Sequence, residues 1–281
     1  MKAVIDIGSN SVRLLYKGKK QVRTTALAKG LALSGTLSSA AIEDTLAAVV
    51  QLYDFACNSG AKQVYVFATE AVRIAQNAAE FINRLEDFGI SIEILTAEQE
   101  AKTGFLGAYT KDIQAILDIG GASSELACGD NKGLLYWHSL AIGAQKLADT
   151  FSGNIRELSF YIKERIAEYE KVPAFGSLVA IGGTATTIVA IKEALEPYDA
   201  NVVQGYILQA KDILLIAKEI FAMPLPARYN IKGLPAKKVT VIAPGALLLY
   251  HIMEYLGAES CIVSENDNME GYLLLKSQGK I

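Results

Sequence analysis

The sequence predicts an α/β protein of two similarly built halves around a shared cleft, and the main reason is a repeated motif. Residues 3–14 (AVIDIGSNSVRL) and 115–126 (AILDIGGASSEL) both show a buried strand, an aspartate, a small-residue turn and a second strand. The two stretches align at a constant offset of 112 residues. In a chain of 281 residues, such a repeat predicts two domains of ordinary size, at 1–114 and 115–281.

Helical and strand patterns alternate along the first half, as an α/β fold requires. Ser38 is the expected N-cap of a helix that ends near Cys57, because apolar residues recur at helical spacing between them. Capping-box patterns that begin at Asn77 and Thr96 predict two further helix starts. We therefore expect strands at 3–7, 12–16, 64–68 and 91–95, helices at 38–57, 77–87 and from 96, and turns or loops at 17–20 and 30–35.

The second half starts with the repeated motif, and its next two strands are joined by a hairpin turn at 130–133. A short apolar strand then runs into Gly182, Gly183 and Thr184, followed by a helix that Pro197 stops. We expect strands at 115–119, 125–128, 134–139, 178–181, 203–208 and 262–264, and helices at 143–151, 156–170, 185–195, 210–221, 243–256 and 269–276.

Three turns of this chain are suited to phosphate binding. Gly8–Ser11 and Gly120–Ser123 each follow a buried strand that carries an aspartate, Asp6 or Asp118. Such turns present backbone N–H groups to phosphate oxygens beside a metal ion. Gly182–Thr184 lies between a strand and a helix, where free N–H groups also attract anions. A single glycine turn is a weak indication, and three in one chain are a stronger one.

Three sets of charged residues can each be interpreted in two ways. Arg73 is expected in a loop after a buried strand, either as a salt-bridge partner or as a phosphate clamp. Glu98 and Glu100 fall in the first turn of a helix, where carboxylates usually only favour the helix dipole. A carboxylate there could also be a general base acting on a water beside a bound phosphate. The basic turn Lys17–Lys20 is either a solvated hairpin tip or a lip that attracts a polyanion.

Composition excludes several classes of protein. A net charge of −3 provides no basic field for nucleic acid. No apolar run is long enough for a transmembrane helix, and no signal peptide precedes the first strand, so we expect a cytoplasmic protein. The three separated cysteines predict buried thiols in a reducing compartment, and the two histidines argue against a histidine-rich metal site or a Ser–His–Asp triad. These residues are Cys57, Cys128, Cys261, His138 and His251.

Six motifs together resemble the exopolyphosphatase/guanosine pentaphosphate phosphohydrolase (Ppx/GppA) family over nearly the whole chain. They are DIGSNS at 6–11, ATEAVRIAQN at 68–77, LTAEQEA at 95–101, LDIGGASSE at 117–125, IGGT at 181–184 and PGALLL at 244–249. The resemblance implies an actin/hexokinase/Hsp70-like (ribonuclease H-like) duplicated α/β fold of the short, two-domain type. It also implies magnesium-dependent cleavage of phosphoanhydride bonds, with inorganic polyphosphate or guanosine pentaphosphate or tetraphosphate as the bound partner.

The resemblance also assigns roles to residues. Glu100 matches the family's catalytic glutamate and would activate a water for in-line attack. Asp6, Asp118 and Glu125 would hold Mg²⁺, which would neutralise the phosphate oxygens. The phosphate-binding residues would be Gly8, Ser9, Asn10, Ser11, Arg73, Gly120, Gly121, Ala122, Ser123, Gly182, Gly183 and Thr184.

Departures from the family pattern affect the surrounding polar contacts rather than these residues. The chain has Ala26-Leu27-Ala28-Lys29 where members often have an RLGE-like run, and Lys238-Val239-Thr240 where they often have Arg-Ala-Asp. Lys146 and Met269 stand where members usually have arginine. These changes put the substrate in question more than hydrolysis itself.

Two rival functions stay open at this point. One is an ATP-dependent small-molecule kinase on the same fold, although the short chain leaves little room for an acceptor pocket. The other is a non-catalytic polyphosphate or guanosine-nucleotide sensor, or an actin-like assembly protein. Apolar residues on exposed helices make a homodimer an expectation.

Overall fold

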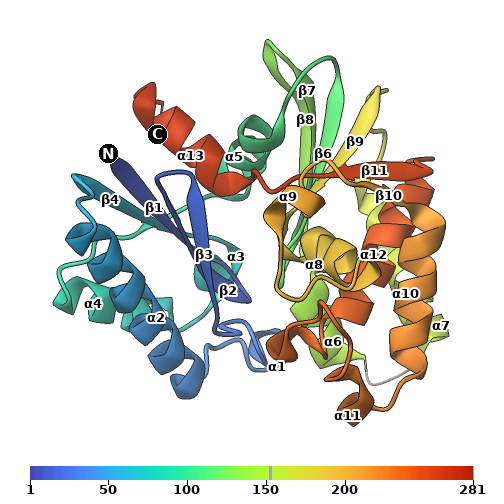
Figure 1. The fold of residues 1–281 in the computed structure, drawn as a ribbon, viewed down its shortest axis with the longest axis horizontal. Helices are drawn as coiled ribbons and strands as arrows, with labels where there is room; N and C mark the ends of the chain where they lie inside the picture. Colours follow the sequence, from blue (N-terminus) through green and yellow to red (C-terminus); the bar gives the residue numbers. More distant parts are fainter. Residues whose placement is uncertain (152–153, 281) are drawn as a thin grey trace.

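In a computed structural model that describes residues 1–151 and 154–280, the chain forms two mixed β-sheets with helices around them (Figure 1). The first sheet contains β1 (Lys2–Ile7), β2 (Ser11–Tyr16), β3 (Lys19–Thr24), β4 (Gln63–Ala68) and β5 (Glu93–Ile94). The second contains β6 (Gln114–Ile119), β7 (Ser124–Asp130), β8 (Gly133–Leu140), β9 (Ser177–Ile181), β10 (Ile207–Gln209) and β11 (Ser260–Val263).

The two sheets repeat one topology. The strand orders are β3-β2-β1-β4-β5 and β10-β11-β9-β6-β7-β8. In each sheet the strand that carries the aspartate pairs in parallel with one neighbour, β4 or β9, and antiparallel with the strand that follows its turn. The sequence repeat is therefore also a repeat of strand pairing, as predicted.

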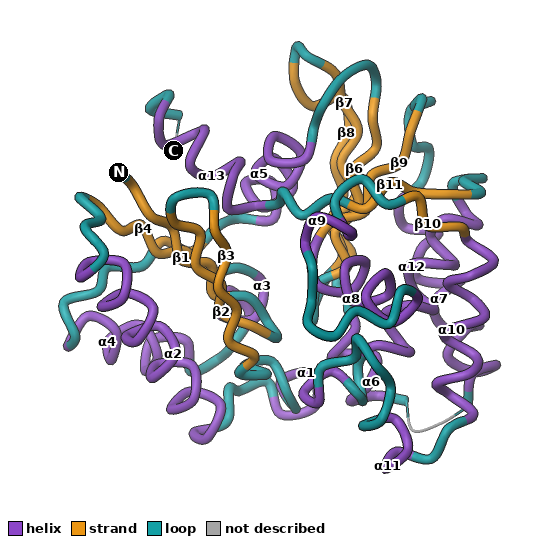
Figure 2. The backbone as a smooth tube through the Cα atoms, in the orientation of Figure 1, coloured by secondary structure: helices purple, strands orange, loops and turns teal. Residues whose placement is uncertain are grey.

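Helices fill the connections, and Figure 2 shows how they surround the strands. Those before the second sheet are α1 (Leu31–Ser34), α2 (Ser39–Asn58), α3 (Glu70–Ile74), α4 (Ala78–Asp87) and α5 (Ala97–Ala108). Those after β8 are α6 (Ala144–Thr150), α7 (Ile155–Ile166), α8 (Gly182–Lys192), α9 (Ala200–Val203), α10 (Ala210–Ala222), α11 (Leu225–Arg228), α12 (Ile242–Tyr255) and α13 (Asn268–Ser277), with 3₁₀ turns at Ala167–Tyr169 and Ala236–Lys238.

Strand alternation decides which helices the two aspartates meet. Ile5 and Ile7 of β1 pack into the core under α2, whereas Val4 faces Met269 and Tyr272 of α13. Because side chains alternate along a strand, Asp6 shares the face of Val4 and points towards α13.

The same rule holds in the second sheet. Leu117 and Ile119 of β6 pack into the core that includes α8 and α12, whereas Ile116 packs with Ala101 and Phe105 of α5. Asp118 shares the face of Ile116 and therefore points towards α5.

Helix α13 consequently lies on the first sheet and α5 on the second, and the two helices pack against each other. A Cβ atom at Gly107 of α5 would come within 1.9 Å of the Asp267 carbonyl oxygen, and one at Gly271 of α13 within 1.8 Å of the Thr103 carbonyl oxygen. Glycine at these two positions is what allows the helix backbones to approach so closely. This close crossing brings the residue that precedes α13 next to both sheets.

Several expectations about local structure are confirmed and several are wrong. Ser38 caps α2 by accepting from the Ala41 N–H group, and Thr96 and Gln99 form the predicted capping box of α5. The capping box at Asn77 is wrong, because its side chain makes no cap bond. It instead accepts from the Leu37 N–H group at 2.8 Å and holds the loop before α2.

Other errors come from short or exposed elements. Residues 30–35 contain the short helix α1 rather than only a loop, and Arg73 lies in α3 rather than in a loop. The strand expected at 203–208 starts too early, since Val203 ends α9 and β10 covers only Ile207–Gln209. Half of the expected turn 17–20 belongs to β3, a strand with no buried residue and no alternating apolar pattern to reveal it.

The first sheet ends before residue 114 and the second starts there, while α5 packs on the second sheet and α13 on the first, so the predicted limit between 114 and 115 stays a prediction. Cys128 and Cys261 are buried as expected, but Cys57 is exposed. Among the described residues, no helix has both the length and the apolar character that a membrane crossing requires.

Candidate active site

The first predicted turn joins β1 to β2. The Gly8 N–H group donates to the Ser11 carbonyl oxygen at 3.0 Å, which closes the turn. Asp6 lies opposite Arg13 in the strand register, and the Arg13 guanidinium donates to Asp6 Oδ2 from Nε at 3.0 Å. The same guanidinium donates from Nη1 to Asp267 Oδ2 at 2.5 Å. Arg13 therefore joins the first turn to the residue that caps α13.

The second predicted turn has the same backbone. The Gly120 N–H group donates to the Ser123 carbonyl oxygen, again at 3.0 Å. Here, however, Asp118 lies opposite Glu125, so two carboxylates face each other across the hairpin. The Ser139 hydroxyl of β8 donates to Glu125 Oε1 at 2.8 Å.

The third predicted turn lies beside the second. Gly182 has a φ of +80° and lies so close to Asp118 that a Cβ atom there would be 2.3 Å from Asp118 Oδ1. Thr184 donates to the Ile119 carbonyl oxygen at 3.0 Å, which fixes the first turn of α8 against β6. The helix begins at Gly182 rather than at residue 185, so the Gly-Gly-Thr run is its N-terminus.

The turns of the two sheets touch each other. A Cβ atom at Gly121 would lie 2.7 Å from the Ser9 Cβ atom, so the second turn has room only for glycine beside the first. Burial disfavours the charged form of Arg13, but Asp267, Asp6 and Asp118 more than offset it and raise the guanidinium pKa. Asp6 and Asp118 thus act on one cation, and the two hairpins meet as their sequence repeat predicts.

Glu100 reaches the same region from the first turn of α5. The residue is buried, at 6% exposure, and its Oε2 atom lies 3.1 Å from Arg73 Nη1. Arg73 also pairs with Glu70 and donates to the Leu95 carbonyl oxygen. Arg73 is therefore a salt-bridge partner of Glu100, and a role in phosphate binding stays a prediction.

The acidic groups favour their protonated forms more than usual. Burial, followed by repulsion from Glu125, raises the pKa of Glu100 well above its ordinary value despite the opposing Arg73. Burial raises the pKa of Asp118 to about 6, and burial with repulsion from Asp118 raises that of Glu125 to about 8. Burial also raises the pKa of Asp6, although Arg13 opposes it. A cation placed among these groups would stabilise their ionised forms against both burial and mutual repulsion.

The donor set suits a hydrated cation rather than one enclosed by protein. Buried carboxylate oxygens are ligands that Mg²⁺ accepts, and Asp6 Oδ1 is buried with no hydrogen-bond partner among the described residues. Within residues 1–151 and 154–280, however, no three His, Cys, Asp or Glu side chains come close enough together to form a metal site. An ion beside Asp118 and Glu125 would therefore keep most of its ligands from water and substrate, as Mg²⁺ usually does.

Sequence reasoning missed three residues of this region: Arg13, Asp267 and Asn268. Arg13 precedes Glu125 by 112 residues and therefore occupies the equivalent position of the repeat. The repeat could have identified it. Asp267 and Glu270 form a capping box at the start of α13, a pattern that is readable in the sequence. Nothing in the sequence places Asn268 near Asp118, since 150 residues separate the two.

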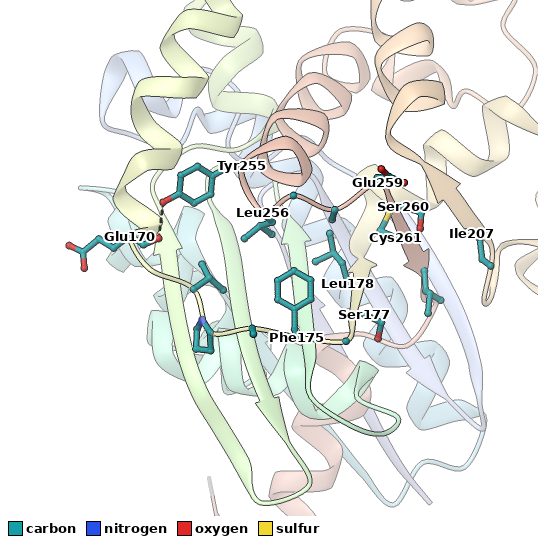
Figure 3. Close-up of a pocket in the computed structure, with 17 residues that line it drawn as sticks. Glu170, Phe175, Ser177, Leu178, Ile207, Tyr255, Leu256, Glu259, Ser260 and Cys261 are labelled. Carbon is teal, nitrogen blue, oxygen red and sulfur yellow. Dashed lines mark hydrogen bonds between the residues drawn. The ribbon is translucent and has the colours of Figure 1, made fainter.

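A groove much larger than the space beside Glu100 lies elsewhere in the described structure. Its volume is about 880 Å³, and Figure 3 shows Glu170, Phe175, Ser177 and Tyr255 among the residues that line it. Ser177 starts β9, whereas the predicted site lies at the carboxyl ends of β6 and β9. Ligands of α/β proteins bind at the carboxyl ends of strands, and this groove contains none of the predicted site residues.

Comparison with known proteins agrees with the fold. The model of the Ppx/GppA phosphatase family matches residues 3–278. Exopolyphosphatase 2 of Mycobacterium tuberculosis is 25% identical, over 97% of each chain. A bifunctional 3-dehydroquinate synthase/phosphatase of Fusobacterium nucleatum is 29% identical over 98% of this chain, and a guanosine-5'-triphosphate,3'-diphosphate pyrophosphatase of Aeromonas hydrophila is 28% identical over 96%. The chain spans 46% and 58% of these last two proteins.

Solved structures show the same fold. The Aquifex aeolicus member of the Ppx/GppA family has 26% identity and a TM-score of 0.80, covering 99% of this chain and 98% of its own. An exopolyphosphatase from Cytophaga hutchinsonii superimposes with a TM-score of 0.88 at 22% identity, over 99% of this chain and 98% of its own. The fold class predicted from the resemblance is therefore confirmed.

Proposed function

Because the chain belongs to the Ppx/GppA phosphatase family, we propose that it hydrolyses phosphoanhydride bonds and releases terminal phosphate from inorganic polyphosphate or guanosine pentaphosphate. The two substrates correspond to the names of its relatives, exopolyphosphatase and guanosine-5'-triphosphate,3'-diphosphate pyrophosphatase. The domain limits 1–114 and 115–281, a homodimer and a cytoplasmic location are parts of the same proposal.

The observation that carries this proposal is the placement of Glu100. It is a buried carboxylate at the start of α5, on the side of the second sheet to which Asp118 points, and its pKa is raised. A general base works best when its pKa lies near the working pH. Glu100 would accept the proton of a water that attacks the terminal phosphorus, and Arg73 would hold its carboxylate in position.

The turns would bind the phosphate chain. Backbone N–H groups of Gly8–Ser11, Gly120–Ser123 and Gly182–Thr184 would donate to its oxygens, except those of Gly8 and Gly120, which close their own turns. Arg73 would add a charged donor. These groups are fixed before substrate arrives, because each turn is closed by its own hydrogen bonds. Donors that need no rearrangement stabilise developing charge efficiently.

Mg²⁺ is the cation we propose, beside Asp118 and Glu125 and on the side of Asp6. When bound, it would neutralise phosphate oxygens and orient the terminal group. The raised pKa values of Asp118 and Glu125 and the unpartnered Asp6 Oδ1 atom support this placement.

Phosphate release from long polyphosphate, short polyphosphate and guanosine pentaphosphate, each with and without Mg²⁺, tests the proposal. We expect Glu100→Gln to fold normally and to lower kcat by ~10²–10⁴. Glu98→Gln is the matched control, because Glu98 lies in the same helical turn but is exposed. Unchanged turnover in Glu100→Gln would refute the assignment of the base. Binding of guanosine pentaphosphate without phosphate release would instead support a sensor.

A further inference from the structure

Asn268, the first residue of α13, is a polar side chain buried beside the proposed catalytic carboxylates. Only 3% of the residue is exposed. It lines a cavity of about 10 Å³ together with Glu100, Asp118 and Glu125. A cavity of this size holds about one water molecule. Asn268 therefore belongs to the surroundings of the site, although it lies at the far end of the chain.

The Asn268 amide has one partner and one free atom. Its Nδ2 group donates to Asp118 Oδ2 at 3.4 Å, while its Oδ1 atom is buried with no hydrogen-bond partner among residues 1–151 and 154–280. Leaving a buried polar atom without a partner costs about 1–3 kcal/mol, so a functional reason for it is expected. A water or a hydrated cation in the neighbouring cavity would provide the missing donor.

The backbone around Asn268 is firmly held. Asp267 caps α13 in a capping box with Glu270, and its Oδ2 atom pairs with Arg13 and with Lys20 at 3.1 Å. Lys20 also pairs with Glu270 at 3.1 Å. Two cations of the first sheet thus fix the start of a helix whose first residue contacts an aspartate of the second sheet.

Helix α5 leaves room for the Asn268 side chain. A Cβ atom at Gly104 would lie 2.7 Å from Asn268 Oδ1, so a larger residue there would displace the amide. The absence of a side chain at Gly104 and the ion pairs of Asp267 position the same amide from two directions.

We propose that Asn268 is a positioning residue that orients the Asp118 carboxylate and thereby sets the affinity of the site for a divalent cation. The proposal rests on the proposed function for the place of the cation, but not on hydrolysis. Partners of metal ligands of this kind typically change metal affinity by 10–100-fold when they are removed. A neutral amide can donate to the carboxylate without adding the negative charge that a third acidic group would bring.

The test measures binding of Mn²⁺ or Mg²⁺ by the full chain without substrate, by titration calorimetry. We expect Asn268→Ala to raise the Kd of the cation about tenfold. Asn268→Asp should act in the opposite direction, lowering the Kd because it adds a carboxylate, while lowering the thermal stability of the cation-free protein. Opposite changes in affinity from two variants at one position are not expected from a purely structural role.

Asn266→Ala is the matched control, since Asn266 lies two residues away and is exposed. Asn268→Ser is the second variant should Asn268→Ala not fold, and a Kd raised at least threefold is expected for it. Cation affinity within twofold of the unchanged protein in both Asn268→Asp and Asn268→Ala or Asn268→Ser would overturn the proposal. Phosphate release decides the proposed function separately, because a protein that binds cations as described but releases no phosphate would refute hydrolysis alone.

Discussion

Asp6 faces Arg13 across the β1–β2 hairpin, whereas Asp118 faces Glu125 across the β6–β7 hairpin. The two hairpins have the same turn, closed by the same 3.0 Å hydrogen bond, and the four residues occupy equivalent positions of the repeat. The first hairpin therefore neutralises its own aspartate, and the second places two buried carboxylates together. The same backbone thus supports an ion pair in the first half and a pair of facing carboxylates in the second.

The arginine of the first hairpin also joins the two halves of the molecule. Arg13 binds Asp6 on its own sheet and Asp267 before α13, and it lies near enough to Asp118 for that carboxylate to raise its pKa. A cation whose side chain is only 18% exposed and which has three anionic neighbours is strongly held, and removing it leaves uncompensated charges. The first hairpin is consequently where we expect the largest loss of stability.

Arg13→Glu would give the first hairpin the charge pattern of the second. We expect this variant to lower the free energy of unfolding by ~3–5 kcal/mol, because Asp6 and Asp267 would lose their cation and gain a like charge. Urea denaturation at neutral pH measures the change. Arg23→Glu is the control, since Arg23 is an exposed arginine of the neighbouring strand β3. An equal loss in the two variants would show that the pairing with Arg13 contributes little.

The facing carboxylates of the second hairpin should make the free energy of unfolding depend on pH. Asp118 and Glu125 have pKa values raised to about 6 and about 8, so the folded protein binds more protons than the unfolded chain between about pH 4 and pH 8. Their contribution to stability is present at acidic pH and is lost as pH rises through these values. Without divalent cations, we expect the ionisation of these two groups to lower the free energy of unfolding by up to a few kcal/mol as pH rises.

Glu125→Gln isolates that contribution. Chemical denaturation in a chelator from pH 5 to pH 8 should show a flatter pH dependence in Glu125→Gln than in the unchanged protein. Glu98→Gln, which alters an exposed glutamate, should leave the dependence unchanged. Parallel curves for all three proteins would contradict the raised pKa of Glu125. Adding Mg²⁺ at pH 8 should stabilise the unchanged protein more than Glu125→Gln.

The smallest expected effect concerns the hydroxyl that supports Glu125. Ser139→Ala removes the donor to Glu125 Oε1 and should cost about 1 kcal/mol. The cost should be larger at pH 9 than at pH 6, because an ionised carboxylate needs the donor more than a protonated one. Ser277→Ala, at an exposed serine of α13, is the control. Equal costs at both pH values would argue that Glu125 does not ionise in this range.

The sequence repeat predicted the paired hairpins because strand, aspartate and turn are local patterns with a fixed spacing. Glu100 and its capping box could be placed for the same reason. The contacts of Asp118 with Asn268 and of Arg13 with Asp267 could not be predicted, because they depend on how α5 and α13 cross between the sheets. The approach of Asp118 to Gly182 depends instead on the pairing of β6 with β9, which lie far apart in the sequence. The error at Asn77 is of the opposite kind. Its local pattern predicts a helix cap, but its side chain accepts a hydrogen bond from the Leu37 N–H group instead.

The crossing of α5 and α13 also constrains how the molecule can be assembled. Val4, Phe67 and Leu95 of the first half are covered by Met269 and Tyr272, which follow them in the chain by more than 170 residues. Until those late residues have been synthesised, this apolar surface stays open to water and to other chains. Such long-range contacts form slowly, so the early half should depend on chaperones during translation and should aggregate when it is expressed alone.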